Sequence, residues 1–176
     1  KEGDLRYRQI RNLAEKLGER GVDIVTGGGP GLMKAASEGH KLGRSDNKTR
    51  TIGLSINLPH EQKTNKYVDF EKKFKRFSAR LENFMLLSDA IVVAPGGVGT
   101  LLEFFYSWQL VQTRKVKTIP IILLGQQWRG MLNWLREFPL RNKMIDKGDI
   151  NLIQLVKNVE EAMKVIDKTS KKHRKK

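Results

Sequence analysis

The stretch "VVAPGGVGTLLEFF", residues Val92 to Phe105, is the part of the sequence from which the fold is best inferred. It passes from an apolar, β-branched segment through a glycine-rich turn into a helical pattern that contains one carboxylate, Glu103. A strand that ends in such a turn and leads directly into a helix is typical of parallel α/β sheets. The stretch also poses a chemical question, because Glu103 either caps the helix or acts on a ligand that the glycines hold.

The same order of strand, turn and helix occurs earlier, in "VDIVTGGGPGLM", residues 22–33. The strand-length segments are apolar throughout rather than at every second residue, which indicates parallel strands covered on both faces. We therefore predict an α/β fold with a Rossmann-like, doubly wound parallel sheet in three layers. It is expected as a single domain over residues 1–167, followed by a basic C-terminal tail at 168–176. The further predicted strands are "TIGLSINL", "AIVVA" and "IPIILL", and the longest predicted helices are "LLEFFYSWQLVQ", "WRGMLNWLREF" and "VEEAMKVIDK".

Two stretches lack a regular pattern, "GRSDNKTR" and "PHEQKTNKYVDFEKKFKRF". We expect them to be flexible or ligand-facing segments, because function concentrates in irregular connections.

The composition restricts the class of protein. With 176 residues and a mass of 20.2 kDa the chain has the size of one domain. It has no cysteine, which excludes disulfides and thiolate metal sites, and it shows no secretory leader, so a cytoplasmic location is expected. The net charge of +15, from 34 Lys and Arg against 19 Asp and Glu, favours anionic partners, either polyanions or phosphorylated small molecules.

Both glycine turns are suited to binding an anion. In "VTGGGPG" and "APGGVGT" the glycines permit positive φ angles and a close approach of the backbone to phosphate. The helix that follows each turn points unpaired N–H groups and the positive end of its dipole outward. Neither turn matches the P-loop pattern or a clean G-x-G-x-x-G. Two such turns at the carboxyl ends of parallel strands predict a nucleotide-like ligand.

Local sequence alone favours structural roles for the two most interesting side chains. Thr100 and Glu103 have the T-x-x-E spacing of a capping box, in which the carboxylate returns to the Thr100 N–H. Arg80 lies in the basic stretch "KKFKRFSAR", where a surface residue is the ordinary expectation. The functional alternatives are a carboxylate that faces a reacting sugar carbon and a guanidinium that holds the substrate.

The motifs "GGGPGLM", "PHEQ" and "PGGVGTLLE", with Arg80 ahead of the last, resemble the Lonely Guy family of nucleoside 5′-monophosphate phosphoribohydrolases, many of which carry the label lysine decarboxylase. The resemblance extends roughly from Gly21 to Asp167, and Arg80 precedes Glu103 by 103 − 80 = 23 positions, the family's spacing. It therefore favours the functional roles of both residues. Family members usually begin with a strand ending in a Gly-Ser turn, and this expected first strand is absent from the chain, which opens with what should follow it.

The resemblance implies hydrolysis of the N-glycosidic bond of a purine nucleoside 5′-monophosphate, AMP or an N6-modified AMP, to a free base and ribose 5-phosphate. Glu103 would stabilise the oxocarbenium-like transition state and orient water, and Arg80 would hold the substrate or orient Glu103. The family also implies a homodimer, to which "LLEFFYSWQLVQ" could contribute, and a role in cytokinin production. The expected substrate-binding residues are Gly27, Gly28, Gly29, Gly31, Met33, Glu61, Gly96, Gly97, Val98, Gly99 and Thr100, the last five taking the 5′-phosphate.

No metal or cofactor is expected. His60 beside Glu61 does not make a metal site, which needs three or more convergent ligands. Decarboxylation would need pyridoxal phosphate on a lysine, and no lysine is placed by a motif. The alternative function is a non-catalytic Rossmann-like module that binds a nucleotide signal or single-stranded nucleic acid. That alternative fits the basic charge, but the aromatic residues lie in apolar runs rather than in exposed stacking positions.

Overall fold

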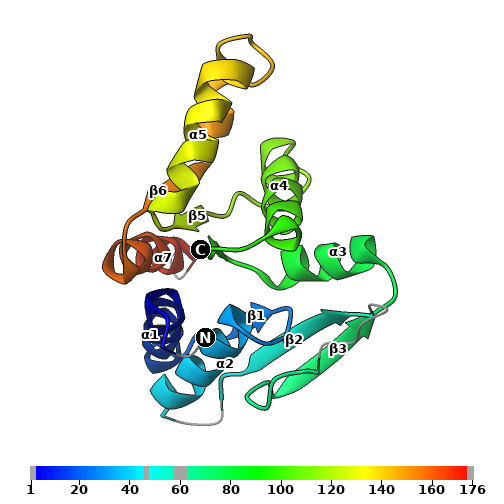
Figure 1. Ribbon diagram of the computed structural model, residues 1–176, viewed down its shortest axis with the longest axis vertical. Helices are drawn as coiled ribbons and strands as arrows, with labels where there is room; N and C mark the ends of the chain where they lie inside the picture. The colour runs from blue at the N-terminus through cyan, green and yellow to red at the C-terminus, as the bar shows by residue number, and fades with distance from the viewer. Residues whose placement is uncertain (1–2, 46–47, 58–62, 174–176) are drawn as a thin grey trace. The chain divides into compact units, whose positions relative to one another are not determined.

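A computed structural model describes residues 3–45, 48–57 and 63–173, with side chains up to residue 169. The chain forms two compact units, Lys1–Leu87 and Ser88–Lys176. Each unit contains a parallel three-stranded sheet with helices between its strands (Figure 1). The predicted α/β fold with parallel strands is confirmed. The single domain over residues 1–167 stays a prediction.

The first unit has a sheet in the order β1-β2-β3. Its elements are α1 (Leu5–Glu19), β1 (Ile24–Thr26), α2 (Leu32–Gly43), β2 (Thr51–Ile56), β3 (Phe70–Phe74) and α3 (Phe77–Leu87). Helix α2 contacts β1 and β2, whereas α3 contacts β2 and β3. Helix α1 lies against α2 (Figure 1).

Helices α1 and α2 approach each other at glycine. A Cβ atom on Gly39 would lie 2.0 Å from the Arg11 carbonyl oxygen, and one on Gly43 would lie 1.9 Å from the Glu15 carbonyl oxygen. The two glycines are four residues apart and so share one face of α2. The backbone of α1 therefore rests on the backbone of α2, and no other residue type fits at these positions without moving a helix.

Strand β3 corrects the expectation that residues 59–77 are irregular. Phe70–Phe74 pairs in parallel with β2, although most of its side chains are exposed. Asp69, just before the strand, ties it to β2 by accepting hydrogen bonds from the Thr51 N–H and hydroxyl, each at 2.9 Å. The strand was missed because it is charged rather than apolar. Residues 58–62 lie outside the described residues.

The second unit has a sheet in the order β4-β5-β6. Its elements are β4 (Ile91–Val93), α4 (Val98–Gln112), β5 (Ile121–Leu124), the 3-10 turn η1 (Gln126–Trp128), α5 (Arg129–Leu135), the π-helical η2 (Arg136–Leu140), α6 (Lys147–Asn151), β6 (Ile153–Val156) and α7 (Val159–His173). All four side chains of β5 are fully buried, and both α4 and α7 contact this strand.

The arm that follows β5, residues 126–140, is less regular than predicted. The sequence "WRGMLNWLREF" indicated one helix, but η1, α5 and η2 succeed one another there, with Pro139 inside the last. Proline has no N–H for the helical ladder, which accounts for a local change of helix type near it. Strand β6 and helix α6 were not predicted at all, because "NLIQLV" is too short and mixed to stand out.

Helix α7 continues to His173, so the first part of the predicted basic tail is helical, and residues 174–176 lie outside the described residues. In the part of the chain that the structure describes, no helix combines the length and the apolar character needed to cross a bilayer.

Candidate functional site: two glycine turns

The first glycine turn joins β1 to α2 and needs glycine for its backbone. Gly28 has φ +75° and Gly31 has φ +69°, values that side chains disfavour. A Cβ atom on Gly28 would also lie 3.2 Å from the Cα atom of Gly53 on β2. The predicted positive φ angles are therefore confirmed at this turn, whereas the predicted close approach of its backbone to a phosphate stays a prediction.

Asn65 holds the first turn in place through side-chain and backbone hydrogen bonds. Its Nδ2 atom donates to the carbonyl oxygens of Gly28 and Gly29, at 2.9 and 3.0 Å. Its backbone N–H also donates to the Gly28 carbonyl, at 2.8 Å. Asn65 lies in the stretch predicted to be ligand-facing, but no motif marked this residue.

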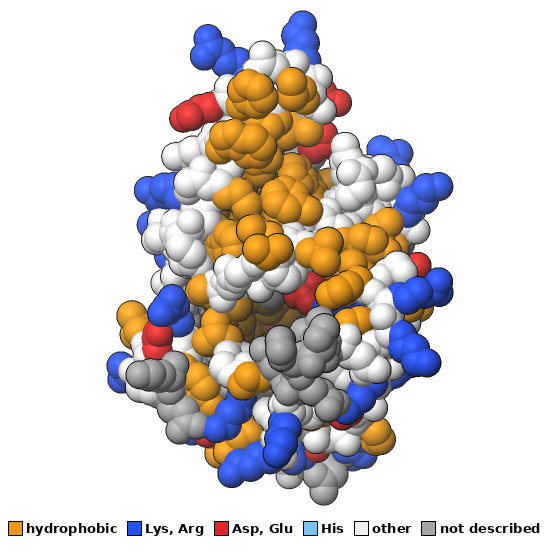
Figure 2. Space-filling model, turned by 45° about the vertical axis from the view of Figure 1, so that its right-hand side comes forward, with side chains coloured by type: hydrophobic (Ala, Val, Ile, Leu, Met, Phe, Trp, Pro, Cys, Tyr) orange, Lys and Arg blue, Asp and Glu red, His pale blue; other side chains and the backbone are white. Residues whose placement is uncertain are grey.

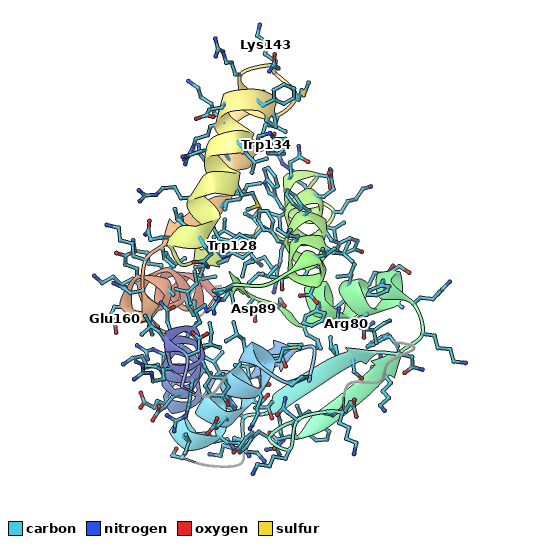
Figure 3. The ribbon with its side chains drawn as sticks, viewed as in Figure 1. Arg80, Asp89, Trp128, Trp134, Lys143 and Glu160 are labelled. Carbon is cyan, nitrogen blue, oxygen red and sulfur yellow. The ribbon has the colours of Figure 1, made fainter. Side chains whose placement is uncertain are left out.

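Arg80 is buried, with 8% of its surface exposed, so the expectation of a surface residue is wrong. It projects from α3 (Figure 3), and its Nε donates to the Leu54 carbonyl at 2.6 Å. Its guanidinium carbon lies 4.9 Å from the centre of the Phe84 ring. Burial of an arginine requires fixed partners, and these contacts hold the side chain in one place.

The Arg80 guanidinium lies at the first glycine turn. A Cβ atom on Gly27 would come within 2.8 Å of both Arg80 Nη2 and Met33 Sδ. Glycine at position 27 is therefore needed to make room for these two side chains. The structure brings together three of the predicted site residues in the first unit, namely Gly27, Met33 and Arg80.

The second glycine turn uses glycine for space rather than for positive φ. None of its glycines has φ above zero, which corrects the expectation for this turn. A Cβ atom on Gly96 would collide with the Thr100 hydroxyl, at 2.1 Å. At Gly97 and Gly99, in contrast, an added Cβ would meet no atom within 4 Å. Packing within the described residues therefore does not explain why these two positions are glycine.

Helix α4 begins at Val98 with Gly97 as its N-cap. The N–H groups of Val98, Gly99 and Thr100 belong to the first turn, which has no intrahelical acceptors. The sequence-predicted phosphate site at Gly96–Thr100 therefore coincides with the exposed start of a long helix. Of these five residues only Thr100 is half-buried, and the others are exposed.

Glu103 does not belong to a capping box. Thr100 lies inside α4 rather than at its N-cap, and α4 has no side-chain cap. Glu103 is half-buried in the second turn of the helix, and its carbonyl oxygen accepts from the Ser107 hydroxyl at 2.6 Å. It stands three residues after Thr100 and four after Gly99, so the three share one face of α4.

Glu61 lies outside the described residues. Arg80 and Glu103 belong to different units, and their pairing stays a prediction. Within residues 3–45, 48–57 and 63–169, no three His, Asp or Glu side chains gather as metal ligands would. The absence of a metal and of a cofactor likewise stays a prediction.

Comparison with known sequences relates the chain to nucleotide-cleaving proteins. The family model described as "Possible lysine decarboxylase" matches residues 33–166. The pyrimidine/purine nucleotide 5′-monophosphate nucleosidase of Escherichia coli strain K12 is 30% identical over 125 residues, which are 68% of this chain and 28% of that protein. The chain thus spans little more than a quarter of the length of this relative.

Solved structures share the fold. The molybdenum cofactor binding protein from Rippkaea orientalis has a TM-score of 0.69 and 21% identity, covering 93% of this chain and 86% of that one. The molybdenum cofactor carrier protein from Chlamydomonas reinhardtii has a TM-score of 0.68 and 21% identity, covering 93% and 87%. A structural-genomics target with 23% identity, covering 96% and 91%, also scores 0.68. These structural similarities establish a Rossmann-like α/β fold. At such low sequence identities they show the fold and nothing about function.

Proposed function

Because the chain belongs to the possible lysine decarboxylase family, we propose that it hydrolyses the N-glycosidic bond of a nucleoside 5′-monophosphate, releasing the base and ribose 5-phosphate. The distant sequence relation to a nucleotide 5′-monophosphate nucleosidase supports this class of reaction. A purine base, adenine or N6-modified adenine, is our proposed substrate preference. Cytokinin production is the biological role that the resemblance implies, and a cytoplasmic location is proposed with it.

The observation that carries the proposal is the open space at Gly97 and Gly99, at the start of the helix that carries Glu103. A Cβ atom added at either glycine would meet no atom of the described residues within 4 Å. Backbone N–H groups at a helix start bind phosphate through hydrogen bonds and the helix dipole. Glycine lets the phosphate oxygens come close to these N–H groups. The 5′-phosphate is therefore proposed to bind at Gly96–Thr100.

Glu103 is proposed to act on the sugar of the same nucleotide. When the bond between the anomeric carbon and the base nitrogen breaks, positive charge develops on the ribose ring. An ionised carboxylate one turn along the helix from the phosphate would oppose that charge and take a proton from the attacking water. The hydroxyl group then joins the anomeric carbon, and the proton passes to the leaving base.

Arg80 is proposed to hold the substrate or to orient Glu103 through charge-assisted hydrogen bonds. Its burial and its fixed bond to the Leu54 carbonyl support a positioned cation rather than a solvated one. Lysine would keep the charge but lose the planar, forked arrangement of donors.

A homodimer is also proposed. Trp134 and Phe138 on the α5–η2 arm are 54% and 51% exposed, and their rings stack at 6.4 Å. Figure 3 shows Trp134 on this arm, and hydrophobic side chains gather over the same region in Figure 2. On α4, Leu102 and Phe105 are exposed, whereas Phe104 of the same run is buried as core. Large exposed aromatic residues favour a protein contact.

The enzyme proposal is tested by incubating the protein with a panel of nucleoside monophosphates and identifying the free base by mass. We expect adenine release from AMP or an N6-modified AMP by the wild type. Loss of Glu103 removes charge stabilisation, so Glu103→Gln is expected to lower the rate at least about 100-fold. Arg80→Lys is expected to lower it about 10-fold or more. Unchanged base release by both variants, or no release by the wild type, would overturn the proposal.

A second candidate function is binding without cleavage. The net charge of +15 favours an anionic ligand and does not require that the ligand be cleaved. A non-catalytic module would bind a nucleotide, or single-stranded nucleic acid, and release no base. If the ligand is a polynucleotide, its affinity falls steeply as salt is raised. That combination of results would select this function over the enzyme.

A further inference from the structure

We propose that Asn65 is a positioning residue for the substrate, acting through the first glycine turn. Its carboxamide would set the orientation of the peptide group between Gly28 and Gly29, so that the Gly29 N–H is presented to the bound nucleotide. This inference rests on the proposed function, because it assigns a role in binding the same substrate.

The orientation of the Asn65 carboxamide is determined by its own partners. Its Oδ1 accepts from the backbone N–H of Tyr67 at 3.1 Å, so the other end of the group must be the donor. That donor, Nδ2, reaches the carbonyl oxygens of Gly28 and Gly29 at 2.9 and 3.0 Å. With the backbone N–H of Asn65 also on the Gly28 carbonyl, at 2.8 Å, three hydrogen bonds hold one short piece of turn.

These bonds determine where the neighbouring N–H group points. The carbonyl of Gly28 and the N–H of Gly29 belong to one planar peptide group and point in opposite directions. Since the carbonyl is held toward Asn65, the N–H points away from it. The next residue, Pro30, has no N–H, so Gly29 supplies the donor at this place in the turn.

The Gly29 N–H is a donor in need of an acceptor. Gly28 and Gly29 are both buried, and the Gly28 N–H is satisfied by the Thr26 hydroxyl at 3.0 Å. Within the described residues, the Gly29 N–H has no protein acceptor. Backbone donors in buried segments are nearly always paired. A phosphate, hydroxyl or base acceptor of the substrate would complete the set.

The same turn lies against the catalytic machinery proposed above. Gly27 has room for Arg80 Nη2 and Met33 Sδ only because it lacks a Cβ. A shift of the turn by a few tenths of an ångström would therefore change the surroundings of the guanidinium. Asn65 thus supports both the N–H donor and the packing around Arg80, without itself needing to touch the substrate.

The test compares Asn65→Asp with wild type. The carboxylate keeps the shape of the side chain but replaces the donor by a second acceptor facing two carbonyl oxygens. We expect KM for the cleaved nucleotide to rise about 10-fold to 100-fold, with kcat changed less than about 3-fold. Protonation restores one O–H donor, so the rise in KM should shrink as the pH falls toward 5. A structural defect alone would not give this pH-dependent recovery.

The matched control is Asn83→Asp. Asn83 lies in the same unit, is half-buried, and donates to the Ala79 carbonyl at 2.8 Å. It contacts neither glycine turn in the bonds described, so KM should stay within about 3-fold of wild type. If Asn65→Asp does not fold, Asn65→Ala serves in its place: it removes both the Nδ2 donor and the Oδ1 acceptor of the Tyr67 N–H, and circular dichroism confirms the fold.

Binding is measured separately by calorimetry with AMP in the Glu103→Gln background, where turnover is suppressed. We expect AMP affinity to fall about 10-fold to 100-fold on adding Asn65→Asp. Equal AMP affinity with and without the substitution, or equal losses from Asn83→Asp, would overturn the inference. If the wild type binds AMP without releasing base and Asn65→Asp weakens that binding, the inference on Asn65 holds and the proposed hydrolysis fails.

Discussion

Arg80 is held inside the first unit, where its Nε donates to the Leu54 carbonyl. The identity and spacing of Arg80 and Glu103 were recognised from motifs, but the burial of Arg80 could not be predicted. The neighbouring sequence "KKFKRFSAR" is basic and polar, and only the packing of α3 against β2 places this one arginine inside. The capping box at Thr100 failed for a related reason, because helix α4 begins earlier, at Val98, than the T-x-x-E pattern implies.

Gly99 yields a prediction in which stability and binding change in opposite directions. Gly99→Ala adds a methyl group in open space and replaces glycine inside a helix, which favours folding by up to about 1 kcal/mol. If phosphate binds there, the same methyl obstructs it, so KM for the nucleotide should rise at least about 10-fold. Urea unfolding and steady-state kinetics on the same preparation measure both effects.

Gly130→Ala is the control for Gly99→Ala. Gly130 is also an exposed helical glycine with nothing within 4 Å of an added Cβ, but it lies in α5. It should gain similar stability and leave KM unchanged. Unaltered KM in Gly99→Ala would argue against a phosphate at the start of α4.

At the scale of elements, the apolar strands and amphipathic helices were predicted, and the elements held by long-range contacts were not. Strand β3 is charged, and it forms because β2 offers a parallel edge and Asp69 bonds to Thr51. Burial raises the pKa of Asp69, but hydrogen bonds from Arg44 and Thr51 outweigh it and leave the pKa below its ordinary value. None of these partners is adjacent to β3 in sequence, so no local sequence pattern predicts the strand.

The contact between α1 and α2 predicts a strong effect of a small substitution. Gly39→Ala raises helix propensity, yet its Cβ would lie 2.0 Å from the Arg11 carbonyl oxygen. Overpacking should dominate and lower the free energy of unfolding by about 1–3 kcal/mol. Urea unfolding of Gly39→Ala beside Gly130→Ala measures the difference. Equal stability of the two variants would contradict the close approach of the helices.

His40 also lies on α2, and because of it we expect the protein to lose stability in mild acid. The ring is fully buried, and its Nε2 lies 2.8 Å from the Val22 carbonyl oxygen, so this nitrogen carries the proton of the neutral ring. Burial lowers the pKa of His40 below its ordinary value of 6.5. The unfolded chain then binds more protons than the folded one below about pH 6.5, and the stability contributed by the neutral ring is lost as the pH falls.

Urea midpoints at pH 7.5 and pH 5.5 test the role of His40. The wild type should lose stability by at most about 1.4 kcal/mol per pH unit over this range from this residue. In His40→Gln the pH dependence should be smaller, although the variant is less stable at pH 7.5. An identical pH dependence in both proteins would show that another group is responsible.

At the scale of the whole chain, the parallel α/β class was predicted correctly because it depends on the order of elements and not on their exact ends. Domain organisation is harder to predict from sequence, because it depends on which contacts cross between segments. Each of the two compact units has its own sheet. Binding partners are harder still to predict. The chain has 34 basic and 19 acidic residues, a net charge of +15 that favours anionic partners but does not select among them.

The proposed dimer gives the prediction at this scale. Trp134→Glu places a charge on the exposed stacked pair with Phe138, so the variant should sediment as a monomer at concentrations where the wild type is a dimer. Phe70→Glu is the control, since Phe70 is 59% exposed but lies on β3. In analytical ultracentrifugation, the Phe70→Glu variant should still sediment as a dimer. A monomeric wild type at all concentrations would contradict the proposal.

The exposed lysines of β3 affect how copies of the protein can associate at high concentration. Lys72 and Lys73 are neighbours on the outer strand of the first sheet, and their side chains leave it toward opposite faces. A second copy that tried to extend the sheet by adding its own β3 would bring ammonium groups of both copies together. Charged side chains on an outer strand oppose such pairing, so β3 is expected not to join the β3 strand of a second copy.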